Sequence, residues 1–358
     1  MKNQDVRTWW KTRSSLDFRL KTLVESMENT WLGCWKGLCL GKSVSDERTK
    51  LLLTKMDSIS EIAETANTDL LQCLLDSATF LSREQLTAAI CQLWKCNPFD
   101  EIYSKLCTAL ADLAAELPET ERHPVVLILD KNIQGLPWEC MPILKNVPVT
   151  RMPSLNLLSV KLNSQEVESI IKTGINCEKG YYILNPGGDL MESQSYFQTQ
   201  FEKQSNWEGI TGRPPSPTEY ISALRDYDLF IYCGHGTGRK YIEGNAIGKI
   251  KCHATAILMG CSSGHLKRLG KQLEADGIAL KYLLNGCPCV VGNLWDVTDK
   301  DIDRFTEKLI KLLVPNYSSN ENSTDVAHAT CIARNVCRLK YLVGAAPIVY
   351  GFPISAKK

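Results

Sequence analysis

Two side chains that could form a nucleophile–base pair follow two short apolar runs. The stretch DLFIYCGHGTG (228–238) places His235 directly after one run, and TAILMGCSSG (255–264) places Cys261 directly after another. An imidazole beside a thiol can take its proton or stabilise the thiolate, which then attacks a carbonyl carbon. The two stretches therefore predict a cysteine nucleophile, Cys261, with a histidine base, His235.

Small residues around the pair suit the same chemistry. Gly234 and Gly236 permit tight backbone geometry beside His235, and residues 262–264 (Ser-Ser-Gly) leave room for a peptide across the thiol. The backbone amides of Gly236 and Cys261 are the predicted donors to a developing oxyanion. Taken singly, a histidine that caps a turn and a buried thiol are the better explanations, but the pair favours catalysis.

A zinc site is the alternative use of these side chains. The candidate ligands are Cys233, His235, Cys252, His253, Cys261 and His265. None of their spacings matches the two- to four-residue cysteine spacing of structural zinc sites, and Cys287 and Cys289 stand too close together for it. We therefore expect neither a metal nor an organic cofactor.

A cluster of acids follows the next apolar run. GNLWDVTDKDIDRF (292–305) contains Asp296, Asp299, Asp301 and Asp303. Thr298 with Asp301 resembles a capping box, and acids in a first helical turn favour the helix dipole. That leaves Asp303 as a spare carboxylate. An acid cluster beside a thiol nucleophile suits a basic side chain, so cleavage after Arg or Lys is predicted, with Asp303 as the first choice and Asp301 as the second for the pocket.

The runs that carry these residues read as strands of one sheet. VVLIL (125–129), YYIL (181–184) and CVVGN (289–293) have the same short apolar character as the strands before His235 and Cys261, and helical segments lie between several of them. Alternation of this kind predicts an α/β fold with a mostly parallel sheet flanked by helices. The carboxyl ends of parallel strands meet at one edge, where active sites form.

The first third of the chain has a different period. Residues 16–31 place Leu16, Leu20, Leu23, Val24, Met27 and Trp31 at three- and four-residue spacing before Gly33. This pattern predicts a helix whose stripe faces a core. We expect a helical region over 1–118 and an α/β domain over 119–358.

Composition excludes several function classes. The 358 residues include 41 basic and 40 acidic side chains, so no global field attracts nucleic acid or an acidic membrane, and sequence-specific nucleic-acid binding is not expected. The polar N-terminus lacks a signal-peptide core, and no aliphatic run is long enough to span a bilayer. Fifteen cysteines without a secretory signal predict reduced thiols in cytosol or nucleus.

Several long motifs, in order, resemble the C-terminal protease domain of separase, a clan CD cysteine protease related to caspases. They are YCGHGTG, ILMGCSSG, GIALKYLLNGCPCVVGNLWDVTDKDIDRF and RLKYLVGAAPIVYG, preceded by VLILDKNIQGLPWECMPILKNVPVTRMPSL and YYILNPGGDL. The resemblance covers roughly residues 124–353 and implies a caspase-like fold. The sequence MGCSSG departs from the caspase QAC pattern, so Asp-specific cleavage is not implied.

The resemblance also implies roles and partners. His235 matches the family's catalytic histidine, Cys261 its nucleophile, and an acid of 296–303 receives the arginine, with Asp303 preferred over Asp301. Separases cleave the kleisin subunit of cohesin after arginine, usually with an acid upstream, and so release sister chromatids. The expected partners are that kleisin and a securin-type pseudosubstrate inhibitor. A helical-repeat scaffold is also expected, either as the missing part of a longer product whose protease end this chain is, or on a separate polypeptide. The expected location is cytoplasm and nucleus, at chromosomes and spindle in mitosis.

Two other functions stay open on the sequence. One is another caspase-like peptidase with Arg or Lys specificity. The other is an inactive protease-like scaffold that binds partners. The acid run after Trp295 favours separase over the first, and the presence of both His235 and Cys261 argues against the second.

Overall fold

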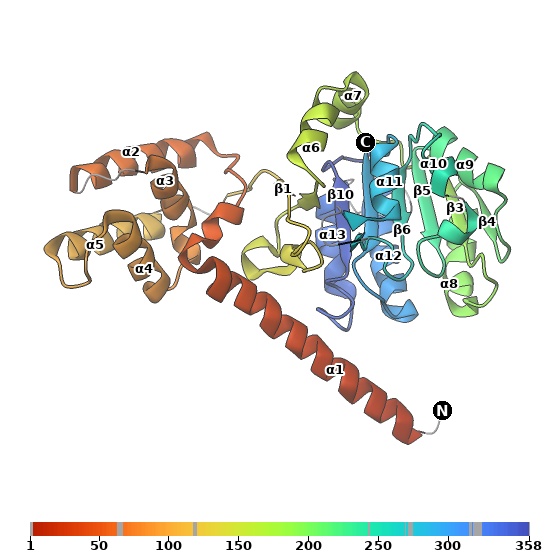
Figure 1. Ribbon diagram of the computed structural model, residues 1–358, viewed down its shortest axis with the longest axis horizontal. Helices are drawn as coiled ribbons and strands as arrows, with labels where there is room; N and C mark the ends of the chain where they lie inside the picture. Colours follow the sequence, from red (N-terminus) through yellow and green to blue (C-terminus); the bar gives the residue numbers. More distant parts are fainter. Residues whose placement is uncertain are drawn as a thin grey trace. The chain divides into compact units, whose positions relative to one another are not determined.

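The computed structural model describes residues 3–62, 67–116, 120–242, 244–268, 270, 275–314, 317 and 324–357. The chain forms two compact units (Figure 1). The sheet unit comprises Met1–Lys21, Val126–Cys140 and Pro148–Lys358, and the helical unit comprises Thr22–Val125 and Met141–Val147. No helix among the described residues is long and apolar enough to cross a membrane.

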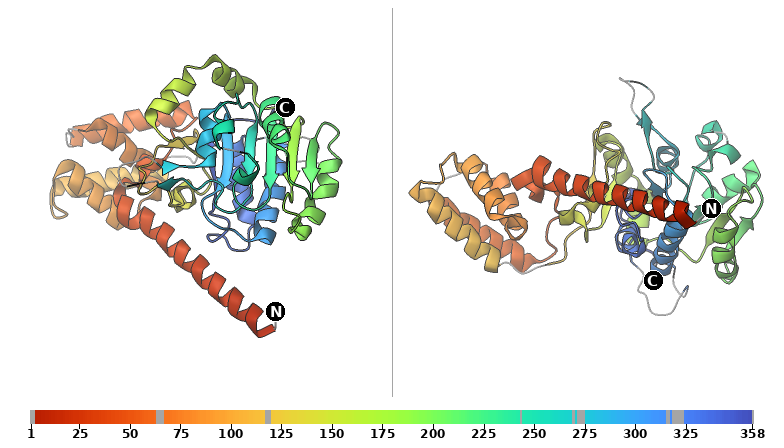
Figure 2. Two further views of the ribbon diagram at one scale, coloured as in Figure 1. Left: turned by 45° about the vertical axis from the view of Figure 1, so that its right-hand side comes forward. Right: turned by 90° about the horizontal axis from the view of Figure 1, so that it is seen from below.

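The sheet unit is built on one large sheet, visible edge to edge in Figure 2. Its eight strands lie in the order β1-β2-β10-β9-β6-β5-β3-β4. Their bounds are β1 Val125–Leu127, β2 Val149–Arg151, β3 Gly180–Leu184, β4 Glu208–Thr211, β5 Leu229–Cys233, β6 Thr255–Leu258, β9 Cys289–Asn293 and β10 Pro347–Gly351. A two-stranded sheet joins β7 (Lys267–Arg268) to β8 (Ala275–Asp276).

The centre of the sheet is parallel and buried on both faces. The pairs β4–β3, β3–β5, β5–β6 and β6–β9 are all parallel. Every residue of β3, β5, β6 and β9 is buried, which explains why these strands read as continuous apolar runs rather than alternating ones. The expected α/β fold with a mostly parallel sheet is confirmed.

Helices cover the sheet. The contacts join α8 to α12 and α12 to α13, while α10 contacts α11, and Tyr282 of α11 donates a hydrogen bond to Tyr220 of α9 at 2.8 Å. The bounds are α6 Leu155–Leu162, α7 Gln165–Thr173, α8 Met191–Glu202, α9 Pro217–Asp226, α10 Gly244–Ile247, α11 Ile278–Leu284, α12 Asp299–Leu313 and α13 Val326–Ala333. Short 3-10 turns occupy Trp138–Cys140, Pro142–Leu144, Arg239–Tyr241 and Arg334–Val336.

The helical unit has its own core. Leu71, Leu74 and Leu75 of α3 pack with Ile90 of α4 and Leu110 of α5. The helices are α2 Asp46–Ile62, α3 Thr68–Ser77, α4 Arg83–Trp94 and α5 Glu101–Glu116, with 3-10 turns at Gly33–Cys39 and Ala78–Phe80. Helix α1 (Asn3–Ser26) continues into a π-helical segment, Met27–Leu32, that ends at Gly33.

Two details differ from the sequence expectations, and one strand, at residues 347–351, was not among the predicted elements. Trp31, placed in the core stripe by its spacing, is 53% exposed, because the chain leaves the α-helical period at Met27. The apolar tail supplies β10, which runs antiparallel to β9 and parallel to β2 inside the sheet. The compact units also place Met1–Lys21 with the sheet and Met141–Val147 with the helices, whereas the predicted domains met at residues 118 and 119.

Candidate active site

The predicted nucleophile and base follow neighbouring parallel strands at equivalent positions. Tyr232 of β5 pairs with Leu258 of β6, and His235 and Cys261 each stand three residues beyond that pair. The Met259 amide donates to the Tyr232 carbonyl at 2.9 Å and extends the pairing past the strands. Since both connections turn at the same edge, the two side chains line one pocket, as the strand pattern predicted.

A glycine brings the two loops into contact. A Cβ on Gly260 would lie 1.8 Å from the Gly236 carbonyl oxygen and 2.6 Å from that of Gly234. Only a residue without a side chain fits at that distance. Gly260 is therefore the reason that the loop carrying Cys261 can lie directly against the loop carrying His235.

The Cys261 thiol is half-buried and protonated. Its Sγ lies 3.6 Å from the Val297 carbonyl oxygen, to which it donates. Burial raises the pKa of this thiol above its ordinary value, and the negative charges of Asp296 and Asp299 raise it further. The raised pKa favours the neutral thiol over a preformed thiolate, so the predicted nucleophile needs a base to activate it.

The residue after the nucleophile holds a strained backbone. Ser262 has φ +54°, a left-handed value that is uncommon for a non-glycine residue. Its hydroxyl donates to Asp296 Oδ1 at 2.7 Å, and its amide donates to the Trp295 carbonyl at 3.1 Å. These bonds tie the turn after β6 to the segment after β9 and so offset the backbone strain at Ser262.

Asp189 is a site residue that sequence reasoning missed. His235 Nε2 lies 3.0 Å from Asp189 Oδ2, and both side chains are more than half exposed. Asn185, at the end of β3 with φ +50°, holds the Asp189 loop by accepting from the amides of Asp189 and Leu190 at 3.0 and 2.9 Å. The sequence signal that could have identified Asp189 is its position after a third parallel strand, as the acid of NPGGD.

The Gly236 turn is open to a ligand. A Cβ on Gly236 would meet nothing within 4 Å, and its φ is +61°. Among the residues that the structure describes, none accepts a hydrogen bond from the Gly236 amide. The Tyr232 hydroxyl donates to the His235 carbonyl at 2.8 Å and steadies the turn that carries this amide.

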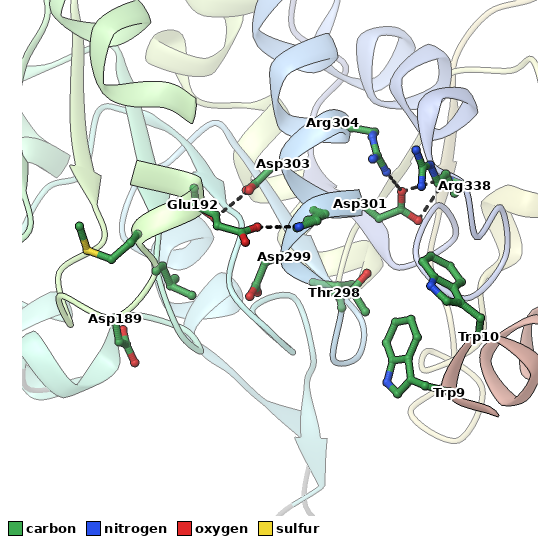
Figure 3. Close-up of a pocket in the computed structure, with 15 residues that line it drawn as sticks. Trp9, Trp10, Asp189, Glu192, Thr298, Asp299, Asp301, Asp303, Arg304 and Arg338 are labelled. Carbon is green, nitrogen blue, oxygen red and sulfur yellow. Dashed lines mark hydrogen bonds and ion pairs between the residues drawn. The ribbon is translucent and has the colours of Figure 1, made fainter. Parts of the chain in front are cut away.

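The two acids predicted for the arginine pocket have separate surroundings (Figure 3). Asp303 lines the same pocket as His235 and Cys261, and its Oδ2 accepts from the Ser193 hydroxyl at 2.7 Å. Burial raises the Asp303 pKa to about 6, with Asp299 and Glu192 adding to the shift. The cavity measures about 20 Å³, which is room for about one water molecule.

Asp301 points elsewhere and is 3% exposed. Its carboxylate accepts from the Arg338 amide at 2.9 Å and the Leu339 amide at 3.0 Å, and it pairs with the Arg304 guanidinium at 2.7 Å. The capping-box interpretation was therefore wrong: α12 does begin after Thr298, but Thr298 makes no side-chain cap and Asp301 holds the loop after α13.

The candidate zinc ligands do not gather. In the part of the chain that the structure describes, no group of three or more His, Cys, Asp or Glu side chains is arranged to hold a metal ion. His253 instead pairs with Asp228 at 2.7 Å, and Cys233 and Cys252 are buried.

Known proteins resemble this chain over nearly its whole length. It is 37% identical to mouse separin and 34% identical to separin of Schizosaccharomyces pombe, each over 98% of the chain. The match spans only 16% and 21% of those two proteins. A crystal structure of the Saccharomyces cerevisiae separase–securin complex matches 99% of this chain and 26% of its own chain, with a TM-score of 0.84 and 29% identity.

The model of the separin protease domain matches residues 1–302. That range contains His235, Cys261, Asp299 and Asp301, and it ends one residue before Asp303. It also contains all of the helical unit, Thr22–Val125 and Met141–Val147. Together with the identities to curated separins, this match shows that the chain belongs to the separin protease-domain family.

Proposed function

We propose that this chain is a separase-type cysteine endopeptidase domain that cuts polypeptides after arginine. The observation that carries the proposal is the meeting of a thiol, an imidazole and a carboxylate in one pocket, where Cys261, His235 and Asp303 follow β6, β5 and β9. Membership of the separin family supports the assignment.

His235 acts as the general base. The Asp189 carboxylate can only accept a hydrogen bond, so Nε2 carries the hydrogen and Nδ1 is left free to take a proton. Because the Cys261 thiol is neutral at rest, Nδ1 removes the Sγ proton as Sγ bonds to the carbonyl carbon. Asp189 is a positioning residue: it fixes the tautomer and stabilises the imidazolium that forms.

In the remaining steps, His235 passes on each proton that it takes up. The amides of Gly236 and Cys261 hold the oxyanion, and the imidazolium gives its proton to the leaving nitrogen as the C–N bond breaks. Water then attacks the thioester carbon and loses a proton to His235. The C–S bond breaks, the thiolate regains that proton, and the carboxylic acid is released.

Asp303 is the carboxylate that receives the arginine. It faces the pocket and accepts from the Ser193 hydroxyl, whereas Asp301 is occupied by two amides and Arg304. An arginine side chain is far larger than one water molecule. Its entry therefore requires the Ser193–Asp303 contact to open and the pocket to widen.

The biological substrate follows from the family. We infer that the chain cleaves the kleisin subunit of cohesin, is inhibited by a securin-type pseudosubstrate, and acts in cytoplasm and nucleus. The similarity to a separase that was crystallised with securin supports the inhibitor. The chain spans 16–24% of the length of the curated separins that it matches. We therefore also propose that a further polypeptide region supplies a scaffold for this domain.

The test uses peptides that differ only in the residue before the scissile bond. We expect cleavage after Arg, weaker cleavage after Lys and none after Asp. Cys261→Ser should lower the rate by about a thousandfold or more, while Cys96→Ser, a matched change in the helical unit, should leave it unchanged. Equal cleavage by Cys261→Ser removes the nucleophile assignment, and preference for Asp removes the arginine pocket. Purified cohesin, with and without securin, then tests the kleisin assignment.

A further inference from the structure

A second, larger pocket continues from the pocket of Cys261 within the sheet unit. It has a volume of about 600 Å³, inside the range of about 300–1,000 Å³ that is usual for ligand sites. The two pockets form one continuous depression, because they share the lining residues Leu190, Ser193, Val297 and Asp303. A polypeptide held at Cys261 can reach the larger pocket without leaving the surface.

Two tryptophans form the far wall of this pocket. Trp9 and Trp10 of α1 lie at the opposite side from Asp189 and Glu192 (Figure 3). Their rings meet edge to face with centroids 4.9 Å apart, and Trp10 is 40% exposed. Arg13 covers one indole, with its guanidinium carbon 5.3 Å from the Trp9 centroid. Partly exposed indoles that line a pocket are typical of binding hot spots.

The tryptophan wall is held in place. Asp17 of α1 accepts from the amides of Tyr341 and Leu342 at 2.8 and 2.7 Å. The Trp295 indole donates to the Leu342 carbonyl at 2.7 Å and links the same loop to the segment after β9. The wall is thus connected by hydrogen bonds to the segment that also carries Asp296, so it can contribute binding energy without first being ordered.

The chemistry of the wall favours an apolar ligand. The nearby charges are largely paired, since Glu192 lies 2.9 Å from Lys300 and Asp301 is bound by Arg304. Leu190, Met191 and Val297 add apolar surface to the lining of the same pocket. Apolar and aromatic side chains beside paired charges are common in polypeptide-binding sites.

We propose that Trp9 and Trp10 receive an apolar side chain of the same polypeptide whose arginine enters the Asp303 pocket. This inference deepens the proposed function and rests on it for the identity of the ligand. It adds a second selection point, so that the chain reads an arginine and an apolar residue at a fixed separation.

The experiment scans one apolar residue along an arginine peptide. A series of labelled peptides carries a single Leu at successive positions on either side of the Arg, with Ser elsewhere, and binding to the Cys261→Ser chain is measured by fluorescence polarisation. We expect one position to bind about tenfold more tightly than the all-Ser peptide. The double variant Trp9→Ala/Trp10→Ala should lose that gain, and Trp31→Ala, which removes an exposed indole of the helical unit, should keep it.

Each outcome decides the matter. A Leu preference that survives in Trp9→Ala/Trp10→Ala, or no preferred position at all, overturns the proposal. So does a change in sedimentation of the double variant with no change in peptide selectivity, which assigns the indoles to self-association. With Cys261 kept, Trp9→Ala/Trp10→Ala should cleave a short Arg amide, which does not reach the indoles, at the same rate as the unmodified chain. If the unmodified chain cleaves nothing but the Leu gain depends on the indoles, the proposed function fails and the subsite stands.

Discussion

At the scale of residues, Asp301 and Asp303 show how two acids of one helix can have different hydrogen-bond partners. Residues two apart on an α-helix point in different directions, so neighbouring acids of α12 meet different surroundings. Asp301 is enclosed by amides and a guanidinium and acts as a structural anchor. Asp303 faces the pocket and keeps a raised pKa. The carboxylate with the fewer hydrogen-bond partners, Asp303, is therefore the one that we propose binds the arginine.

The raised pKa of Asp303 predicts a pH dependence of arginine binding. Its value of about 6 means that the carboxyl group is ionised above that pH and becomes protonated as the pH falls through it. Affinity of the Cys261→Ser chain for an Arg peptide should therefore decrease on acidification, by about tenfold for each pH unit well below the pKa. Fluorescence polarisation across this range measures it. A Gln peptide, or Asp303→Asn with the Arg peptide, should show a flat profile, and an equal slope in all three would contradict the assignment.

Asp189 predicts a loss of turnover rather than of binding. In Asp189→Asn the side-chain amide no longer stabilises the imidazolium, so kcat on a short Arg amide should fall by about tenfold to a hundredfold. The loss should be smaller than the about ten-thousandfold loss for a buried triad acid, because the His235–Asp189 pair is exposed. KM should stay within about twofold. Asp226→Asn, at an exposed acid paired with Arg225, is the matched control. Unchanged kcat in Asp189→Asn would remove the positioning role.

At the scale of elements, the site is built from the turns that leave the strands. Gly260 lies against the Gly236 carbonyl, and a Cβ on Gly264 would lie 2.9 Å from the Gly292 carbonyl oxygen, so successive turns touch through their backbones. Asn293, at the end of β9, donates to the Gly260 carbonyl at 3.1 Å. Register, not side-chain length, thus sets the spacing of the reactive groups.

A methyl group at Gly260 should separate the two turns. Gly260→Ala places its Cβ where backbone oxygens already lie, so we expect a loss of about 2 kcal/mol or more in the free energy of unfolding and a severe loss of activity. Gly135→Ala, which meets nothing within 4 Å and has no positive φ, should change neither. Denaturant titration and the peptide assay measure both quantities, and an active, stable Gly260→Ala would show that the contact is not required.

The elements that carry the site could be predicted because their strands are buried on both faces. The apolar runs before His235 and Cys261 coincide with β5 and β6, and the run before the acids coincides with β9. The Asp189 pairing could not be predicted in this way, since it depends on how the NPGGD turn folds around Asn185. The position of β10 could not be predicted either, because an apolar strand gives no signal for antiparallel rather than parallel pairing.

At the scale of the whole molecule, two cores lie on one chain. The helical unit surrounds Leu71, Leu74 and Leu75, and the sheet unit has a larger core of its own around β5, β6 and β9. Units with separate cores usually unfold as separate cooperative units.

Separate cores predict two unfolding transitions. Leu74 is fully buried in the helical unit, and Leu74→Ala should destabilise that unit by about 2–5 kcal/mol. Circular dichroism in urea should then show one transition moved to lower denaturant and the other unchanged. Leu309→Ala, a fully buried leucine of α12, should move the other one. A single transition that shifts in both variants would show one cooperative unit instead.

The hydrogen bond from Cys261 to the Val297 carbonyl has a consequence for chemical probes. A neutral thiol reacts slowly with general electrophiles, so an untargeted alkylating reagent should not label Cys261 faster than the other thiols. A reagent that carries a guanidinium would instead be drawn to Asp303 and would present its warhead to the thiol within reach of His235. Covalent labelling of Cys261 should therefore depend on the recognition group of the probe far more than on the reactivity of its warhead.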